Sequence, residues 1–529
     1  MAKGVKAAAR RPDPLVIGLG DPGMTPLLRG GLGGLAAALR FLRRESDRKA
    51  AWPGEVKLAG GIARVEPARV IIEWGDADPE EVLQDLFERC FRLTKPLGLI
   101  DLAGTYEPER PPADALAAAW QGGLKRTFLQ HGKTTPKAGA PKPVTTEIDG
   151  RPVQFEAQGY LSFAHQGVGA DVAKALTRGR VSLAGWAYPG AAQRHIQFND
   201  TKFSYTASEA TAAAFALIGC VSFAGTRGGA GALVVPEPAD LVAFAEIRPR
   251  LSPRTAAESY VSGLGDAVLA VSAALRMDDV LSRRGVAAAH GVLFATTVWA
   301  KQQKSRVATI SGTSYPPAVL DQYEKLVSEL PNAMRARGTG EADAEEGGIF
   351  AVASALRAFV SDNLARGRPW HFGFADARTA EKKPRWIHRD GRDQGALYAT
   401  DKKGLVAMVE HLDGPEEALV ASVHVALRQR FGAIASESKD APGAMKNRFQ
   451  RERDKWRLAF AGAKTQEQVR AALADLWSRA GSNSALQEGW RIVLPLLNGD
   501  NWRTARDLAL VALASYQGRD TEAEAEGAE

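Results

Sequence analysis

Residues 299–306 combine several kinds of side chain that bind nucleic acids. They follow an apolar, β-branched run from Val292 to Val298 and include one aromatic ring, three cations and two amides: Trp299, Lys301, Gln302, Gln303, Lys304 and Arg306. Amides and guanidinium groups can hydrogen-bond base edges, cations bind phosphates, and an indole ring can stack on a base. An edge strand that leads into a solvated basic turn has the same composition, so the functional interpretation depends on similar clusters elsewhere.

Two more segments place cations beside amide or imidazole groups at the ends of apolar elements. The first surrounds Phe128 and leads into a basic loop predicted over residues 131–144; its candidate residues are Lys125, Arg126, Gln130, His131 and Lys133. The second follows Tyr188-Pro189-Gly190 and contains Arg194, His195, Asn199 and Lys202. Such side chains at loop positions can contact phosphates and bases together, which indicates a nucleic-acid partner.

A fourth cluster lies on one predicted helix near the C-terminus. Its candidate binding residues are Lys446, Arg448, Arg451 and Lys455. Residues 448, 451 and 455 share one helical face because they are spaced by three and four positions. Glu452 and Asp454 partly neutralise this helix, so an ordinary solvated face explains its charges equally well. Together with the other clusters, these cations fit a long nucleic acid better than a small metabolite.

The turn from Gly18 to Gly23 matches the G-x-G-x-x-G pattern and follows a predicted strand, as in dinucleotide-binding folds. Pro22 stiffens this turn and removes one of the amide donors that a phosphate would need. The segments that follow lack the βα alternation that builds a parallel sheet. A dinucleotide-dependent enzyme is therefore a weak alternative.

The rest of the sequence offers no catalytic constellation. Walker, H-E-x-x-H and G-x-S-x-G sequences are absent, the eight histidines are scattered, and the two cysteines, Cys90 and Cys220, stand in apolar contexts. We therefore predict no catalytic residues, no metal site, no cofactor and no enzymatic activity. The cysteine usage and the lack of a signal peptide or an apolar span predict a soluble cytoplasmic protein without membrane contact.

The length of 529 residues exceeds what one hydrophobic core supports, so at least two domains are expected. The net charge of +7 and the pI near 9.2 favour a polyanionic partner. Acidic residues gather at Glu341–Glu346 and in the tail from Asp520 to Glu529, which leaves the remaining chain more basic than the total.

Apolar periodicity predicts an irregular α+β domain followed by an all-α bundle. Thr25-Pro26 marks the start of a helix that runs to about Arg44, and strands are expected over residues 14–19, 65–74, 153–163 and 292–298. After the Gly-, Ala- and acid-rich stretch near residues 331–348, seven segments carry helical periodicity. We predict an α+β domain over residues 1–335, a linker over 336–348, a helical bundle over 349–518 and an acidic disordered tail over 519–529.

Several of these motifs, taken in order, resemble the large subunit of type I CRISPR–Cas surveillance complexes (Cascade), in the subtype first described in myxobacteria. The motifs are Asp21-Pro22-Gly23-Met24-Thr25-Pro26-Leu27, Leu32-Gly33-Gly34-Leu35, Thr127-Phe128-Leu129-Gln130-His131, Gly185-Trp186-Ala187-Tyr188-Pro189-Gly190 with Arg194-His195, and the segment from Trp299 to Arg306. The C-terminal half is similar only in character.

The resemblance implies a subunit without nuclease activity near the 5′ end of a guide CRISPR RNA. Such subunits recognise a short protospacer-adjacent motif in double-stranded target DNA, help to separate the strands and hold the displaced strand. The implied protein partners are backbone and 5′-handle-binding Cascade subunits, the small subunit, and a helicase-nuclease or another recruited effector. The bundle is expected to act like a small subunit, and in some systems it is also made from an internal start, for which Met334 is a candidate.

The residues themselves suggest a division of roles. Gln302, Gln303 and Lys304 have the donors and acceptors needed to read base edges. Lys133, Arg194, Lys301 and Arg306 could contact phosphates. A different RNA-binding ribonucleoprotein subunit is the remaining alternative.

Overall fold

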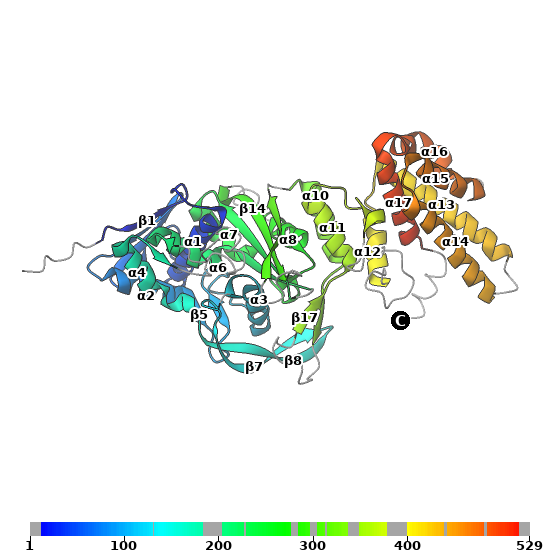
Figure 1. Cartoon of the computed structure of the whole chain (residues 1–529). Helices are drawn as coiled ribbons and strands as arrows, with labels where there is room; N and C mark the ends of the chain where they lie inside the picture. Colours follow the sequence, from blue (N-terminus) through cyan, green and yellow to red (C-terminus); the bar gives the residue numbers. More distant parts are fainter. Residues whose placement is uncertain are drawn as a thin grey trace, which may run out of the picture. The chain divides into compact units, whose positions relative to one another are not determined.

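The computed structural model describes residues 12–130, 132–182, 204–226, 229–276, 284–296, 304–312, 315–336, 349–377, 399–437, 442–480 and 484–517. The chain divides into two compact units: Met1–Pro316 with Asn332–Ala353, and Pro317–Pro331 with Ser354–Glu529. The first unit contains helices and several small sheets, and the second is helical (Figure 1). The predicted fold class, an α+β domain followed by a helical bundle, is confirmed.

A four-stranded antiparallel sheet begins the first unit, with the strand order β1-β4-β3-β2. Its strands are β1 (Leu15–Gly18), β2 (Val56–Leu58), β3 (Gly61–Glu66) and β4 (Arg69–Glu73). Buried residues alternate with half-buried ones along β3, as expected for a strand with one face on a core. Glu66 pairs with Arg69 across a tight turn. The range 65–74, predicted as a single strand, therefore contains the end of β3, this turn and the whole of β4.

Helix α1 (Pro26–Ser46) lies in the core of the first unit. The hydroxyl of Thr25 accepts a hydrogen bond from the backbone amide of Leu28 at 3.4 Å, and proline occupies the first turn. The predicted helix start is therefore confirmed. Gly31 and Gly34 lie directly against the backbone of α6 (Ala207–Gly219), an approach that side chains would prevent.

The second sheet of this unit has the strand order β13-β11-β12-β14-β15. Its strands are β11 (Val221–Gly225), β12 (Gly231–Pro238), β13 (Tyr260–Val261), β14 (Val286–Thr296) and β15 (Lys304–Gly312). Both faces are covered: α1 packs on Val235, while α8 (Leu264–Arg276) packs on Gly291, which pairs with Val234. The sheet is therefore an internal layer between helices.

A buried arginine ties the helices to this sheet. Arg248 of α7 (Leu241–Leu251) is 2% exposed and donates hydrogen bonds to the carbonyl oxygens of Ile218 and Cys220, at the end of α6. Burial lowers the pKa of Arg248 to about 10. A cation at a helix C-terminus interacts favourably with the carbonyl end of the helix, which helps to offset this burial.

A long two-stranded ribbon lies below α3 in Figure 1. Its strands, β7 (Lys137–Ile148) and β8 (Arg151–Ser162), are joined by a turn in which Asp149 and Gly150 have φ values of 50° and 71°. The loop predicted over residues 131–144 is therefore largely wrong, because β7 begins at Lys137. Pro141 and Pro143 suggested a loop, but both are tolerated in a ribbon strand that has only one partner.

The remaining elements of the first unit complete the packing around these sheets. They are α2 (Pro79–Cys90), β5 (Phe91–Leu93), β6 (Ile100–Leu102), α3 (Asp114–Arg126), α4 (Val168–Arg178), β9 (Val181–Ser182), β10 (Ser204–Tyr205), β16 (Ala333–Ala336) and β17 (Ile349–Val352).

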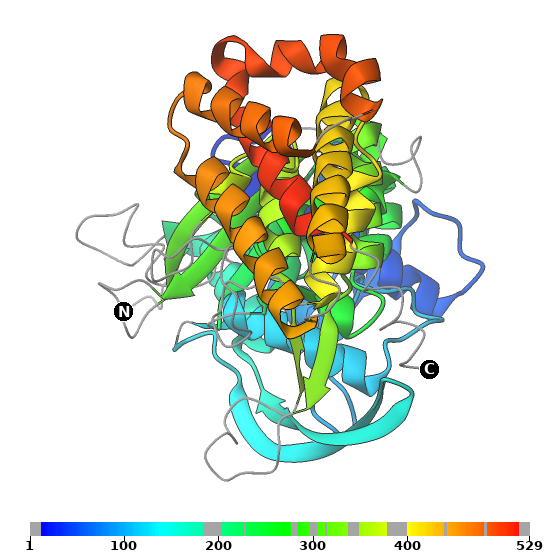
Figure 2. The same ribbon diagram turned by 90° about the vertical axis from the view of Figure 1, so that its right-hand side faces the viewer.

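The second unit is built from helices α10 (Pro317–Glu329), α11 (Ala355–Ala365), α12 (Ala399–Val409), α13 (Gly414–Glu437), α14 (Pro442–Gly462), α15 (Gln466–Ala480), α16 (Ser484–Val493) and α17 (Trp502–Ser515). Helix α17 (red) lies between α13 and α14 in Figure 2 and also contacts α12 and α15. Its Asp507 accepts hydrogen bonds from the backbone amides of Gly373 and Ala375 at 2.7 and 2.9 Å. A nearly all-round buried helix is expected at the centre of a bundle.

The boundary between the units differs from the one expected at residues 336–348. Strand β16 pairs antiparallel with β17, so the chain returns to the first unit after this stretch. Helix α10, which comes before it, packs on α11 and α12 in the second unit. A product that began at Met334 would therefore lack a helix of the bundle. None of the helices in the described ranges has the length and apolar character that a membrane-spanning helix requires.

Candidate nucleic-acid interface

Helix α3 carries Lys125 and Arg126, two of the predicted binding residues, in its last turn. Positive charges are favourable there because the carbonyl end of a helix is partially negative. The helix is capped by Thr127, whose hydroxyl donates to the carbonyl oxygen of Gly123 at 3.0 Å and lies 2.9 Å from the Ser222 hydroxyl of β11. Gly123 also packs against the backbone of Ser222, so α3 is fixed on the five-stranded sheet.

The next predicted residues along the chain have different environments. The side-chain amide of Gln130 donates to the carbonyl oxygens of Arg126 and Thr127, which completes the end of α3. A base contact by Gln130 stays a prediction, and it would require these hydrogen bonds to break. Lys133 is exposed, and His131 lies outside the described residues.

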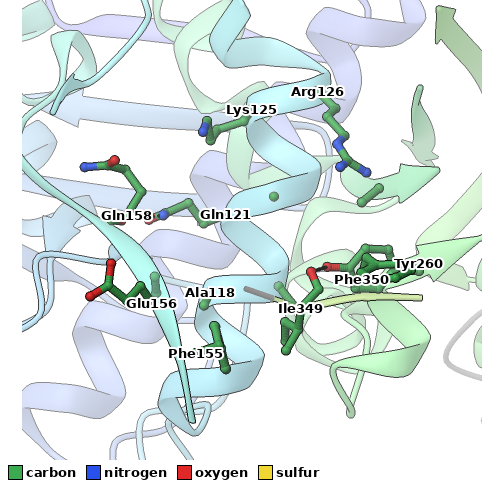
Figure 3. A pocket seen from close by; sticks show the side chains of 14 residues that line it. Ala118, Gln121, Lys125, Arg126, Phe155, Glu156, Gln158, Tyr260, Ile349 and Phe350 are labelled. Atoms are coloured by element: carbon green, nitrogen blue, oxygen red, sulfur yellow. Dashed lines mark hydrogen bonds between the residues drawn. The ribbon is translucent and has the colours of Figure 1, made fainter. Parts of the chain in front are cut away.

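A pocket of about 160 Å³ opens beside α3, between this helix, β8 and β17 (Figure 3). Gly122 forms part of its wall, and a Cβ on Gly122 would meet no atom within 4 Å other than those of its chain neighbours and of the surrounding backbone of α3. Aromatic residues from three other segments line the pocket: Phe155, Tyr260 and Phe350. Lys125 and Arg126 lie at one end of it and leave α3 in different directions (Figure 3).

Hydrogen bonds hold the elements around this pocket in place. Gln121 is 4% exposed; its side-chain oxygen accepts from the Ile100 amide at 3.1 Å, and its nitrogen donates to the Gln158 carbonyl at 2.7 Å. These bonds tie α3 to β6 and β8. The hydroxyl of Tyr260 donates to the carbonyl oxygen of Ile349 at 3.1 Å, which ties β13 to β17. The pocket is therefore preformed by the fold.

Sequence reasoning identified Lys125 and Arg126 but missed the other polar and aromatic residues of this pocket. Residues 155–158, 260 and 349–350 are far apart in the chain, and each segment alone is an ordinary strand. A single sequence carries no signal that brings them together.

The segment with Trp299, Lys301, Gln302 and Gln303 lies outside the described residues, but its two flanking strands are described. Strands β14 and β15 pair antiparallel, with Thr296 opposite Lys304 and Phe294 opposite Arg306. Residues 297–303 therefore connect the two strands of a hairpin, and β15 is the edge strand of its sheet.

The residues of a second predicted cluster also lie, in the sequence, between two strands that pair with each other. Arg194, His195, Asn199 and Lys202 fall within residues 183–203, which lie outside the described residues. This segment runs from β9 to β10, and these strands pair antiparallel through Val181–Tyr205 and Ser182–Ser204.

Helix α14 positions the cationic cluster of the second unit. Arg448 forms an ion pair with Glu437 of α13 at 3.6 Å, and Lys455 forms one with Asp475 of α15 at 3.3 Å. Arg451 is exposed; the backbone of Lys446 belongs to the same helix. The shared face predicted for residues 448, 451 and 455 therefore runs between α13 and α15.

Both of these ion pairs of α14 lie at the surface of the second unit. The side chains of Arg448 and Glu437 are 52% and 60% exposed, and those of Lys455 and Asp475 are 40% and 42% exposed. Exposed pairs contribute only about 0–1 kcal/mol, so a polyanion can displace the carboxylates at little cost. The carboxylates nevertheless reduce the net charge of the face.

The glycine turn at Gly18–Gly23 does not form a dinucleotide site. Strand β1 pairs antiparallel with β4, whereas dinucleotide folds place this turn after a strand of a parallel sheet. The carboxylate of Asp21 accepts a hydrogen bond from the Gly18 amide at 2.8 Å, so an anion already occupies this donor. Within the described ranges, no cluster of three or more His, Cys, Asp or Glu side chains could hold a metal ion.

Two family models and one relative match this chain. Residues 16–217 match the family model described as the DevT N-terminal domain, and residues 408–529 match the DevT C-terminal domain. The chain is 48% identical to the CRISPR-associated protein Cas8a1/Csx13 of Myxococcus xanthus (strain DK1622) over 530 aligned residues, which cover 99% of this chain and 92% of the relative. The family resemblance is thereby confirmed: the chain belongs to the DevT family of CRISPR-associated Cas8a1/Csx13 proteins.

Proposed function

We propose that this chain is the non-catalytic large subunit of an RNA-guided type I CRISPR effector complex. The observation that carries this proposal is the 48% identity to a CRISPR-associated Cas8a1/Csx13 protein across both structural units. The positive net charge and the cationic clusters on both units support a role in binding nucleic acids.

The finer part of the proposal concerns recognition of the protospacer-adjacent motif in double-stranded DNA. The connection between β14 and β15 carries Gln302 and Gln303, and an amide side chain can form two hydrogen bonds with one base edge. The major groove of DNA admits a two-stranded ribbon, and β14 and β15 are the paired strands on either side of these two residues in the sequence. Lys304 and Arg306 at the start of β15 would contact phosphates beside it.

Motif binding would then promote strand separation and R-loop formation. Unstacking a base step costs a few kcal/mol, and the exchange of a DNA duplex for a guide–target duplex is nearly balanced. Phosphate contacts from residues such as Lys133, Arg194 and Lys301 can tip such a balance. The face of α14 between α13 and α15 is suited to hold the displaced strand because its cations are exposed.

The partners of the chain follow from this role. They are the guide CRISPR RNA, the target duplex and its displaced strand, the backbone and 5′-handle-binding subunits, the small subunit, and a helicase-nuclease or other recruited effector. The helical second unit would serve as a small-subunit equivalent.

Co-expression with the neighbouring genes tests this proposal. A tag on this chain should retain a repeating backbone subunit and an RNA of discrete length with repeat-derived ends. Recovery of the chain alone, or with heterogeneous RNA, would favour a different ribonucleoprotein role. A rise in the melting temperature of the purified chain on addition of NAD or FAD would instead favour a dinucleotide-dependent enzyme. We expect no such rise.

A further inference from the structure

The size of the pocket beside α3 limits what it can hold. Its volume is about 160 Å³. A cavity of about 150 Å³ accommodates benzene, whereas sites for cofactors and drug-sized ligands begin near 300 Å³. The pocket is therefore close in size to a cavity that holds one six-membered ring, and it is smaller than the sites that hold dinucleotides or drug-sized ligands.

The walls of the pocket are made of small and aromatic side chains. Ala118 and Gly122 present little side chain from α3, while Phe155, Tyr260 and Phe350 supply aromatic groups from the other sides (Figure 3). Tyr260 is 7% exposed and its hydroxyl is engaged by the Ile349 carbonyl, so its ring is held in place. Stacking on such rings is tolerant of sequence because every base has a π-face.

The mouth of the pocket carries positive charge. Lys125 and Arg126 are half-buried at one end of the cavity. Nη1 of Arg126 donates to the Gly225 carbonyl at 3.0 Å, which fixes the position of the guanidinium group. The charged residues that line the pocket are Lys125, Arg126 and Glu156, so two positive charges face one negative charge. A ring that enters with an attached phosphate fits this arrangement better than a neutral aromatic side chain.

We propose that this pocket holds the base of one unpaired pyrimidine nucleotide, with Lys125 and Arg126 beside its phosphate. The inference rests on the proposed function, because it assumes that the chain binds nucleic acid. A paired base is stacked inside its duplex, and extracting it costs a few kcal/mol more than using an unpaired one. The nucleotide therefore comes from a single-stranded part of the guide RNA or from the displaced DNA strand.

Gly122 offers a variant that closes the pocket without disturbing the fold. A leucine at this position extends into open space, and leucine is a better helix former than glycine. Gly122→Leu should therefore fold at least as well as the natural chain while it fills the cavity. Gly122→Ala is the matched control, since it also replaces glycine with a better helix former but adds only one methyl group to the pocket.

The test uses the assembled complex and four single-stranded probes of equal length: oligothymidine, oligodeoxyadenosine, oligouridine and oligoadenosine. At one fixed salt concentration we expect a pyrimidine probe to bind about tenfold more tightly than its purine counterpart, a difference of about 1.4 kcal/mol in binding free energy. Preference among DNA probes would indicate the displaced strand, and preference among RNA probes the guide. Gly122→Leu should abolish the preference, and Gly122→Ala should keep it.

A photochemical readout locates the base. A probe with 5-iodouracil should crosslink to peptides that contain Tyr260 or Phe350 in the natural complex and in Gly122→Ala, but not in Gly122→Leu. Preference that survives in Gly122→Leu, the absence of any preference, or crosslinks that map elsewhere would overturn the inference. Failure to co-purify with RNA would count against the proposed function itself, whereas assembly without pyrimidine preference would count only against the pocket.

Discussion

Gly31 of α1 lies so close to the carbonyl oxygen of Ala212 in α6 that a Cβ on Gly31 would overlap this atom. Gly34, about one turn later, is also too close to the backbone of Phe215 and Gly219 for a Cβ to fit without a shift. The two helices therefore pack backbone against backbone. Because α1 also covers the four-stranded sheet and β12, this contact holds the core of the first unit together.

Replacing Gly31 with alanine should destabilise the first unit although alanine is the better helix former. The gain in helix propensity is about 1 kcal/mol, but the methyl group must push two helix backbones apart. Overpacking of this kind costs about 1–3 kcal/mol or more, so a net loss is expected. Thermal unfolding of the full chain measures the effect, with Gly122→Ala as the control for propensity alone. An unchanged or raised Tm for Gly31→Ala would show that the helices separate easily.

Lowering the pH should destabilise the first unit through His165. This side chain is fully buried among Phe91 and Phe163, and burial lowers the pKa of His165 to about 3. The unfolded chain takes up this proton near pH 6.5, so between pH 6.5 and 3 the unfolded state binds more protons than the folded state. Stability is therefore complete above pH 6.5 and falls as the pH drops, by up to about 1.4 kcal/mol per unit.

Comparison of His165→Phe with the natural chain isolates this contribution. Urea midpoints at pH 7.5 and 5.5 should differ less for the variant, by the equivalent of about 1.4 kcal/mol. Equal pH dependence in the variant and the natural chain would mean that His165 does not act in this way.

Removing cations from α14 should weaken retention of the displaced strand. We expect the triple variant Lys446→Ala, Arg448→Ala, Arg451→Ala to keep its fold, because Arg448 and Arg451 are exposed and the Arg448 ion pair is weak. Each lost phosphate contact with single-stranded DNA should reduce the magnitude of the slope of log affinity against log salt by about 0.7. A salt titration of single-stranded DNA binding by the complex checks this.

The control for this variant is Arg69→Ala, which removes an exposed, ion-paired arginine from β4 of the first unit. It should leave both the affinity and the salt slope unchanged. If the triple variant behaves in the same way, the charges on α14 serve only solubility and the ion pairs between helices.

Replacing Gln302 and Gln303 with alanine should weaken recognition of the DNA motif but not assembly of the complex. A lost bidentate base contact costs about 1–3 kcal/mol, so affinity for a motif-bearing duplex should fall roughly 5- to 150-fold per contact. Affinity for a motif-less duplex should stay the same, because phosphate contacts carry it. A uniform loss on both duplexes would assign these residues to backbone binding instead.

The sequence was informative wherever local chemistry decides the structure. Thr25-Pro26 predicted the start of α1, and the 3.6-residue periodicity predicted the bundle, because caps and amphipathic faces act within one turn of a helix. The long strand β7 was missed since prolines and glycines suggest a loop unless the partner strand is known. Pairing of β16 with β17 was missed for the same reason, as the acidic stretch between them resembles a linker.

Only part of the candidate site could be predicted from the sequence. Lys125 and Arg126 could be identified from their types and spacing, whereas the pocket beside them is created by contacts between α3, β8, β13 and β17. The ion pairs of Arg448 and Lys455 also depend on neighbouring helices. Contacts between helices determine which carboxylate each cation pairs with, and the sequence of one segment alone does not predict these contacts.

The most direct test of the central claim is to select duplexes with the assembled complex. The library carries a guide-matched target flanked by randomised base pairs, and bound molecules are sequenced. We predict enrichment of a short motif, two or three base pairs long, on one side of the target. Equal recovery of all flanking sequences by a complex that contains guide RNA would contradict the claim that this chain reads DNA.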